Sequence, residues 1–162
     1  WAVDRSYMME DEFDGDNRPT ATLMLSKGNF GRYPMANDLT RLATRFLAEP
    51  EKVTDAQDRI GDGLEAAAAD ELGLVTFIFD DIDWEDEIRI FMEERASFSP
   101  DAMTGMEANL RFAGPETMET RIFGRLTAWQ NWIFQRPNAV GEDGALQRYG
   151  TGKRADLDMR RV

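Results

Sequence analysis

Residues 64–79 read LEAAAADELGLVTFIF and carry the clearest structural signal in this chain. Leu64 to Leu72 consists mostly of strong helix formers. Gly73 follows at the position where helices commonly end on a left-handed glycine. Leu74 to Phe79 is a short apolar run rich in β-branched and aromatic residues, which is typical of a buried strand. A helix that leads directly into a buried strand predicts an α/β fold.

Two further strands are predicted before this stretch. Residues 1–9 (WAVDRSYMM) open with a strand-like run, and Thr20 to Leu25 (TATLML) is rich in β-forming residues. Between them, residues 10–19 (EDEFDGDNRP) are acidic and contain glycine and proline, so they are interpreted as a loop. The N-terminal part therefore reads as strand, loop, strand and turn.

Two helices are predicted between the turn and residue 60. Asn37 can cap the first, which has apolar residues at helical spacing and is expected to stop at Pro50. Thr54 is the cap candidate for the second, a short polar helix to about Ile60.

Three longer helices are predicted after residue 79. The first runs from about Trp84 to Ala96, the second from Ser99-Pro100 to about Phe112, and the third from Gly114 to a point before Pro137. Residues 138–162 contain four glycines and many charges, which predicts an extended tail. We therefore expect an α/β part over 1–79, a helical region over 80–137 and a tail over 138–162.

The composition argues against several kinds of site. A formal net charge of −12 over 162 residues argues against a nucleic-acid partner. The chain has neither Cys nor His, so it lacks the thiolate, the commonest general base and the commonest transition-metal ligand. We expect no metal site. No apolar run approaches 18 residues, so we expect no membrane span and a cytoplasmic location.

The main candidate site is the turn Leu25 to Pro34 (LSKGNFGRYP). It follows a predicted strand and precedes a predicted helix, where α/β proteins commonly place binding residues. Its Lys27, Asn29, Arg32 or Tyr33 could contact an anionic substrate. A tight turn with solvated side chains explains the same residues, and one turn motif is weak support for a site. The pattern alone favours that plainer interpretation.

Three other features of the sequence each have a structural explanation. The acidic run Asp80 to Glu87 lacks histidine and calcium-loop spacing, so it predicts a helix start on a solvated face. Residues 150–153 (GTGK) lack the spacing of a phosphate-binding loop and predict a flexible arm. The aromatic residues Trp129, Trp132 and Phe134 fit core packing and a subunit contact about equally well.

Three blocks of the chain resemble the C-terminal end of the benzoyl-CoA-dihydrodiol lyase family, within the crotonase superfamily. They are residues 25–46 (LSKGNFGRYPMANDLTRLATRF) and, within a longer matching stretch over 80–148, residues 98–112 (FSPDAMTGMEANLRF) and 114–141 (GPETMETRIFGRLTAWQNWIFQRPNAVG). The last two blocks are long and unusual in composition, which argues against chance. The chain opens with Trp1-Ala2-Val3-Asp4 and no methionine, so we expect a C-terminal fragment of a longer enzyme.

The resemblance implies a partial crotonase-like fold and a ring-cleaving lyase. The implied substrate is a dihydroxylated, epoxide-derived benzoyl-CoA, which yields formate and a semialdehyde CoA thioester in aerobic benzoate degradation. The implied partner is thus a CoA thioester, with water as co-substrate and no metal or organic cofactor. The superfamily's C-terminal helices typically pack on neighbouring subunits, which implies a homo-oligomer for the full-length enzyme.

The chain departs from the superfamily at the turn. The second catalytic Glu of the superfamily falls on Lys27, and a lysine ammonium is not a carboxylate base. The oxyanion-hole segments and the first catalytic Glu correspond to positions upstream of Trp1. We therefore expect Lys27 and Asn29 as the catalytic candidates and Gly31, Arg32 and Tyr33 as substrate-binding candidates, with the main catalytic groups elsewhere. The alternative is a non-catalytic half that serves as a scaffold or oligomerisation module.

Overall fold

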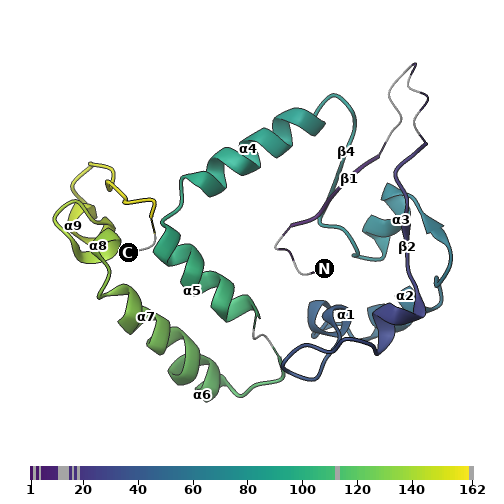
Figure 1. Cartoon of the computed structure of the whole chain (residues 1–162), viewed down its shortest axis with the longest axis horizontal. Coiled ribbons are helices and arrows are strands. Elements are labelled where there is room, and N and C mark those ends of the chain that lie inside the picture. The colour runs from purple at the N-terminus through teal and green to yellow at the C-terminus, as the bar shows by residue number, and fades with distance from the viewer. Residues whose placement is uncertain are drawn as a thin grey trace. The chain divides into compact units, whose positions relative to one another are not determined.

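A computed structural model describes residues 1, 3, 5–10, 15, 17, 19–111 and 114–160. The chain divides into two compact units, Trp1–Met92 and Glu93–Val162 (Figure 1). The predicted mixed α/β class is confirmed, because short strands accompany many helices. The predicted division at residues 79 and 137 stays a prediction. Within the described part of the chain, no helix is both long and apolar enough to cross a membrane.

The first unit contains four short strands, a 3₁₀ turn and several helices among its described residues. In chain order they are β1 (Tyr7–Met9), β2 (Leu23–Met24), η1 (Lys27–Phe30), α1 (Arg41–Arg45), α2 (Glu51–Gln57), β3 (Gly63–Leu64), α3 (Ala66–Glu71), β4 (Phe77–Phe79) and most of α4 (Trp84–Ala96). All three predicted strand regions contain a strand, although each strand is shorter than its apolar run.

Two small sheets bring together segments that are distant in the sequence. β1 pairs with β4 in parallel, with Tyr7 opposite Phe77 and Met9 opposite Phe79. The two strands lie side by side in Figure 1. β2 pairs with β3 in antiparallel orientation, with Leu23 opposite Leu64. The parallel pair is separated by about 70 residues, so helices must form the crossover between its strands.

The core of the first unit lies between these sheets and the helices. Its buried residues are apolar, and they are Met8, Leu25, Leu42, Phe46, Ala56, Leu64, Ala66, Ala69, Leu74 and Val75. Trp1 packs against this core and its indole Nε1 donates to the Leu74 carbonyl at 2.9 Å. Residues 64–75, which carried the strongest sequence signal, thus supply half of the core.

The α3–β4 step ends its helix as predicted. Gly73 has φ 68°, and its N–H donates to the Asp70 carbonyl while the Leu74 N–H donates to the Ala69 carbonyl. This pair of bonds is a Schellman motif, which requires a left-handed residue. The strand begins at Phe77 rather than Leu74, because pairing with β1 starts at Phe77. Leu74 and Val75 are buried in the core before that point.

The starts of α1 and α2, which precede α3 in the chain, differ from the prediction. Thr40 caps α1, since its Oγ1 accepts from the Ala43 N–H at 3.1 Å. Asn37 instead accepts from the Leu39 N–H at 3.1 Å and stabilises the preceding turn. α2 begins directly after Pro50, not at Thr54, so Pro50 starts one helix rather than stopping the other. Proline suits either place because its fixed φ is compatible with a first helical turn.

The second unit is helical in its described part. Its elements, after the end of α4, are α5 (Pro100–Arg111), α6 (Met118–Arg121), the π-helical turn η2 (Ile122–Leu126), α7 (Thr127–Ile133), α8 (Pro137–Val140) and α9 (Ala145–Arg148). α4 and the start of α5 match the prediction, whereas the expected end at Phe112 lies outside the described residues. α5 packs beside α7 through Gly105, where an added Cβ would lie 3.6 Å from Trp129 and Ile133 (Figure 1).

Part of the expected tail is folded. Residues 137–148 form α8 and α9, and Asn138, Ala139 and Gly144 are buried. An added Cβ on Gly144 would lie 2.8 Å from the Pro137 carbonyl oxygen, so the glycine allows the two helices to approach closely. The glycines that suggested an open arm therefore permit close packing here.

Candidate functional site

The turn after β2 is a capped 3₁₀ turn. The Ser26 Oγ accepts from the Gly28 N–H at 3.2 Å, and the Asn29 Oδ1 accepts from the Ser26 N–H at 2.8 Å. The Ser26 hydroxyl also donates to the Asn29 Oδ1 at 3.2 Å. These reciprocal bonds form a capping box. The carbonyl oxygen of the Asn29 side chain is therefore committed to the turn, whereas its NH₂ group is the part available to a ligand.

The base of this turn is anchored in the core. Leu25 has 1% of its surface exposed and forms a parallel bridge with Ile60. Its carbonyl accepts from the Gly61 N–H at 3.0 Å, and Phe30 packs against the core at the other end of the turn. Because both ends are fixed, η1 presents its side chains on a defined backbone.

The remaining predicted residues of the turn face solvent. Lys27, Gly31 and Arg32 are exposed, and Tyr33 has 83% of its surface exposed. Gly31 has φ 154° and Tyr33 has φ 57°, so the chain bends sharply after η1. A positive φ is uncommon for a tyrosine and costs on the order of 1–2 kcal/mol. The structure thus places two exposed cations, a half-buried amide and an exposed aromatic ring within the seven residues from Lys27 to Tyr33. Such a set suits contact with an anion better than a buried reaction centre.

Arg45 contributes to the same unit in a way that the sequence did not reveal. Its Nε donates to the Gly73 carbonyl at 2.8 Å, and burial lowers the pKa of its guanidinium from the ordinary value. The side chain satisfies a carbonyl at the end of α3, next to the Schellman turn. Its role is to connect α1 to the α3–β4 step, and a sequence separation of 28 residues gave no signal for it.

The acidic run before α4 behaves as predicted from its helix-start pattern. The Asp80 Oδ1 accepts from the Asp83 N–H at 2.9 Å, and α4 begins at Trp84. Among the described residues, acidic side chains do not gather into a group of three or more suited to a metal ion. The run is explained as the start of a helix.

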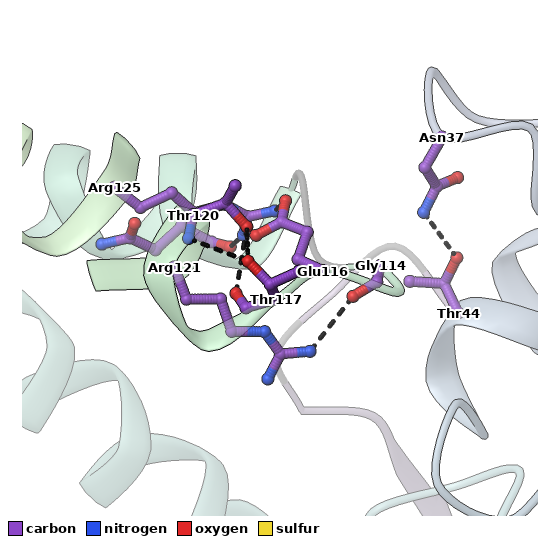
Figure 2. Close-up of polar contacts among 9 residues, drawn as sticks. Asn37, Thr44, Gly114, Glu116, Thr117, Thr120, Arg121 and Arg125 are labelled. Atoms are coloured by element: carbon purple, nitrogen blue, oxygen red, sulfur yellow. Dashed lines mark hydrogen bonds and ion pairs between the residues drawn. The ribbon is translucent and has the colours of Figure 1, made fainter. Parts of the chain in front are cut away.

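Two arginines organise the start of α6 in the second unit, as Figure 2 shows. The Arg125 guanidinium donates to the Asn109 carbonyl at 2.7 Å and forms an ion pair with Glu116. Arg121 donates to the carbonyl of Gly114 at 3.1 Å. Both bonds fix the segment that leads into α6, and Thr117 caps that helix by accepting from the Thr120 N–H at 3.3 Å. These bonds hold the backbone in place, so we interpret the network as structural.

A buried polar group lies between α5, α8 and the C-terminal segment. Asp101, with 2% of its surface exposed, accepts from the Asn138 Nδ2 at 2.9 Å. The same Nδ2 donates to the Asp158 carbonyl at 2.8 Å, and the Asn138 Oδ1 accepts from the Asp158 N–H at 2.8 Å. One carboxamide therefore joins three segments. Sequence analysis missed this group, since only the fold brings these residues together.

Comparison with known proteins supports the predicted resemblance. The chain is 56% identical over 161 residues to the benzoyl-CoA-dihydrodiol lyase of Aromatoleum evansii. The match covers 99% of this chain and 28% of the length of that relative. No family model matches the chain. The resemblance to this lyase is thus confirmed, and the chain spans little more than a quarter of the relative.

Proposed function

We propose that this chain is part of a ring-cleaving lyase that acts on a dihydroxylated, epoxide-derived benzoyl-CoA. The reaction would consume water and release formate and a semialdehyde CoA thioester, as a cytoplasmic step of aerobic benzoate degradation. The observation that carries the proposal is the 56% identity to a benzoyl-CoA-dihydrodiol lyase over nearly the whole chain. A partial crotonase-like fold belongs to the same proposal, and the α/β part followed by helices is compatible with it.

In this proposal the η1 turn contributes substrate contacts rather than a complete reaction centre. The Lys27 and Arg32 cations would attract the phosphorylated CoA thioester to a chain whose net charge is −12. The Asn29 NH₂ group would donate a hydrogen bond, while Gly31 and Tyr33 would shape the contact. The chemistry of a thioester enolate needs paired N–H donors and carboxylates that move protons. We propose that groups outside these 162 residues supply them.

The test is formate release by a longer enzyme that carries this chain, with purified dihydrodiol substrate. Asn29→Asp keeps the acceptor oxygen that binds the Ser26 N–H but loses the NH₂ donor. We expect kcat to fall at least tenfold in Asn29→Asp with the turn intact. Lys27→Gln should raise KM roughly three- to tenfold, because one partly solvated charge contact is lost. Arg59→Gln, at an exposed ion pair with Asp62, is the matched control and should change neither constant.

Lys27→Glu restores the residue type of the superfamily at this position. A large change in kcat would place the turn at the reacting atoms. If Lys27→Gln, Lys27→Glu and Asn29→Asp all keep the kinetic constants of the parent enzyme, the turn has no role in the reaction. If the longer enzyme releases no formate at all, the lyase assignment itself is wrong.

An exposed apolar stripe favours the alternative function, a scaffold and oligomerisation module. Met118, Phe123 and Leu126, on α6 and η2, have 73%, 71% and 59% of their surfaces exposed. Apolar surface of this kind usually marks a protein contact. For this function, Phe123→Asp should dissociate a homo-oligomer of the longer enzyme in sedimentation experiments, whereas Gln135→Asp, at an exposed polar position after α7, is the control. An unchanged oligomeric state in Phe123→Asp would contradict it.

A further inference from the structure

The loop that follows α9 is a folded turn, although its sequence suggested a flexible arm. The Thr151 N–H and hydroxyl both donate to the Arg148 carbonyl, at 3.1 and 2.7 Å. The Lys153 N–H in turn donates to the Thr151 Oγ1 at 3.3 Å. Gly150 and Gly152, with φ 75° and 73°, supply the left-handed conformations that these bonds require.

Both ends of this loop are attached to the second unit. At the start, Arg148 belongs to α9 and forms an ion pair with Asp143. At the end, the Asp156 N–H donates to the Asp143 carbonyl at 3.0 Å, and Asp158 is bound by Asn138. The loop therefore leaves and re-enters the fold at fixed points, and Figure 1 shows this yellow segment beside α8 and α9. Fixed ends reduce the entropy that a ligand would otherwise have to remove on binding.

The side chains of the loop form a cationic and aromatic surface. Residues 144–155 contain Arg148, Lys153 and Arg154 but no acidic residue, in a chain with net charge −12. Lys153 and Arg154 are exposed, and neither forms an ion pair with any residue that the structure describes. Tyr149 has 88% of its surface exposed. An aromatic face can stack on a nucleobase, and neighbouring cations can bind phosphate.

We propose that Tyr149, Lys153 and Arg154 bind the phosphorylated nucleotide end of the substrate. This inference rests on the proposed function, in which the substrate is a CoA thioester. The loop binds the nucleotide through Tyr149 and the phosphates through the two cations. Its role is affinity, so it contributes to KM and leaves the chemical step unchanged.

The direct test measures binding of adenosine 3′,5′-bisphosphate to the 162-residue chain by calorimetry at low ionic strength. Lys153→Gln/Arg154→Gln should raise the dissociation constant roughly five- to thirtyfold, the range expected for two solvent-screened charge contacts. The matched control is Arg59→Gln/Arg89→Gln, which removes the same charge from two exposed ion pairs elsewhere and should bind as the parent does. Tyr149→Leu should weaken adenosine 3′,5′-bisphosphate but leave binding of inorganic tripolyphosphate unchanged.

Three results would overturn the inference: no binding by the parent chain, equal weakening in the control pair, or no weakening in the loop variant. The lyase proposal is tested separately by formate release. Formate release with an unchanged KM in Lys153→Gln/Arg154→Gln would refute the loop and leave the lyase intact. Nucleotide binding by the chain without formate release from the longer enzyme would refute the lyase and leave the loop a nucleotide site.

Discussion

Replacing Asn138 with alanine tests whether one carboxamide joins the three segments of the second unit. The substitution removes a hydrogen bond to the Asp101 carboxylate and two to the backbone of Asp158. A bond to a charged group contributes roughly 1.5–3 kcal/mol and each neutral bond about 1 kcal/mol. Asp101 would remain buried with Arg136 at 4.0 Å as its nearest cation. We therefore expect a loss of about 3–5 kcal/mol, a large share of the stability of a small unit.

Native-state hydrogen exchange, read on peptides from α5 and α8, measures this loss locally. A destabilisation of 3–5 kcal/mol corresponds to exchange faster by roughly two to four orders of magnitude. The control is Asn131→Ala, at an exposed position on α7, which should change the stability by less than about 0.5 kcal/mol.

A second variant separates the charge from the lost contacts. In Asp101→Asn/Asn138→Ala the buried charge that has lost its hydrogen-bond donor is gone, so the double variant should be more stable than Asn138→Ala alone. If Asn138→Ala accelerates exchange less than about fivefold, or if the double variant is less stable than the single, the reasoning about this buried group is wrong.

Three further predictions concern a glycine, a cap and a carboxylate. Gly73→Ala should destabilise the first unit by about 2–4 kcal/mol, and by more than Gly61→Ala. Both glycines have positive φ, but only at Gly73 would an added Cβ meet Phe46, at 3.1 Å. Urea unfolding compares the two variants, and equal losses of stability would contradict the steric argument. Thr40→Ala should cost about 1 kcal/mol through loss of the α1 cap, and Thr40→Ser should recover most of it in the same assay. Hydrogen bonds from the Arg160 side chain and backbone lower the pKa of Asp158 from 3.8 to about 2. This pair therefore contributes stability above about pH 3.8 that is lost as the pH falls toward 2. Carboxyl NMR titration should show the pKa of Asp158 rising toward 3.8 in Arg160→Gln, and an unchanged pKa would refute the pairing.

Local sequence signals predicted the parts of the fold that depend on neighbouring residues. The end of α3 at Gly73 and the start of α5 after Ser99 were both predicted correctly, because each is determined by hydrogen bonds within a few residues. The cap of α1 was not, because Asn37 and Thr40 are both good caps and the turn between them has Asp38 at φ 62°. Only the folded turn decides which side chain reaches the helix.

The candidate site divides in the same way. The η1 turn was predicted from its position between a strand and a helix, and its capping box follows from the Ser-x-x-Asn spacing. That the Asn29 oxygen is occupied, while Tyr33 is almost fully exposed, required the structure. The loop after α9 was interpreted as a flexible arm because glycines permit both disorder and tight turns, and only its hydrogen bonds distinguish them.

By itself the sequence determined the alternation of elements, the absence of histidine and cysteine, and the resemblance to a benzoyl-CoA-dihydrodiol lyase. Those properties reside in composition and in short-range periodicity. Tertiary structure alone decided the parallel pairing of β1 with β4, the reach of Arg45 to Gly73 and the burial of Asp101 against Asn138. These contacts join residues 28 to 70 positions apart. At such separations the type of a side chain does not identify its partner, because the two segments meet only when the chain packs.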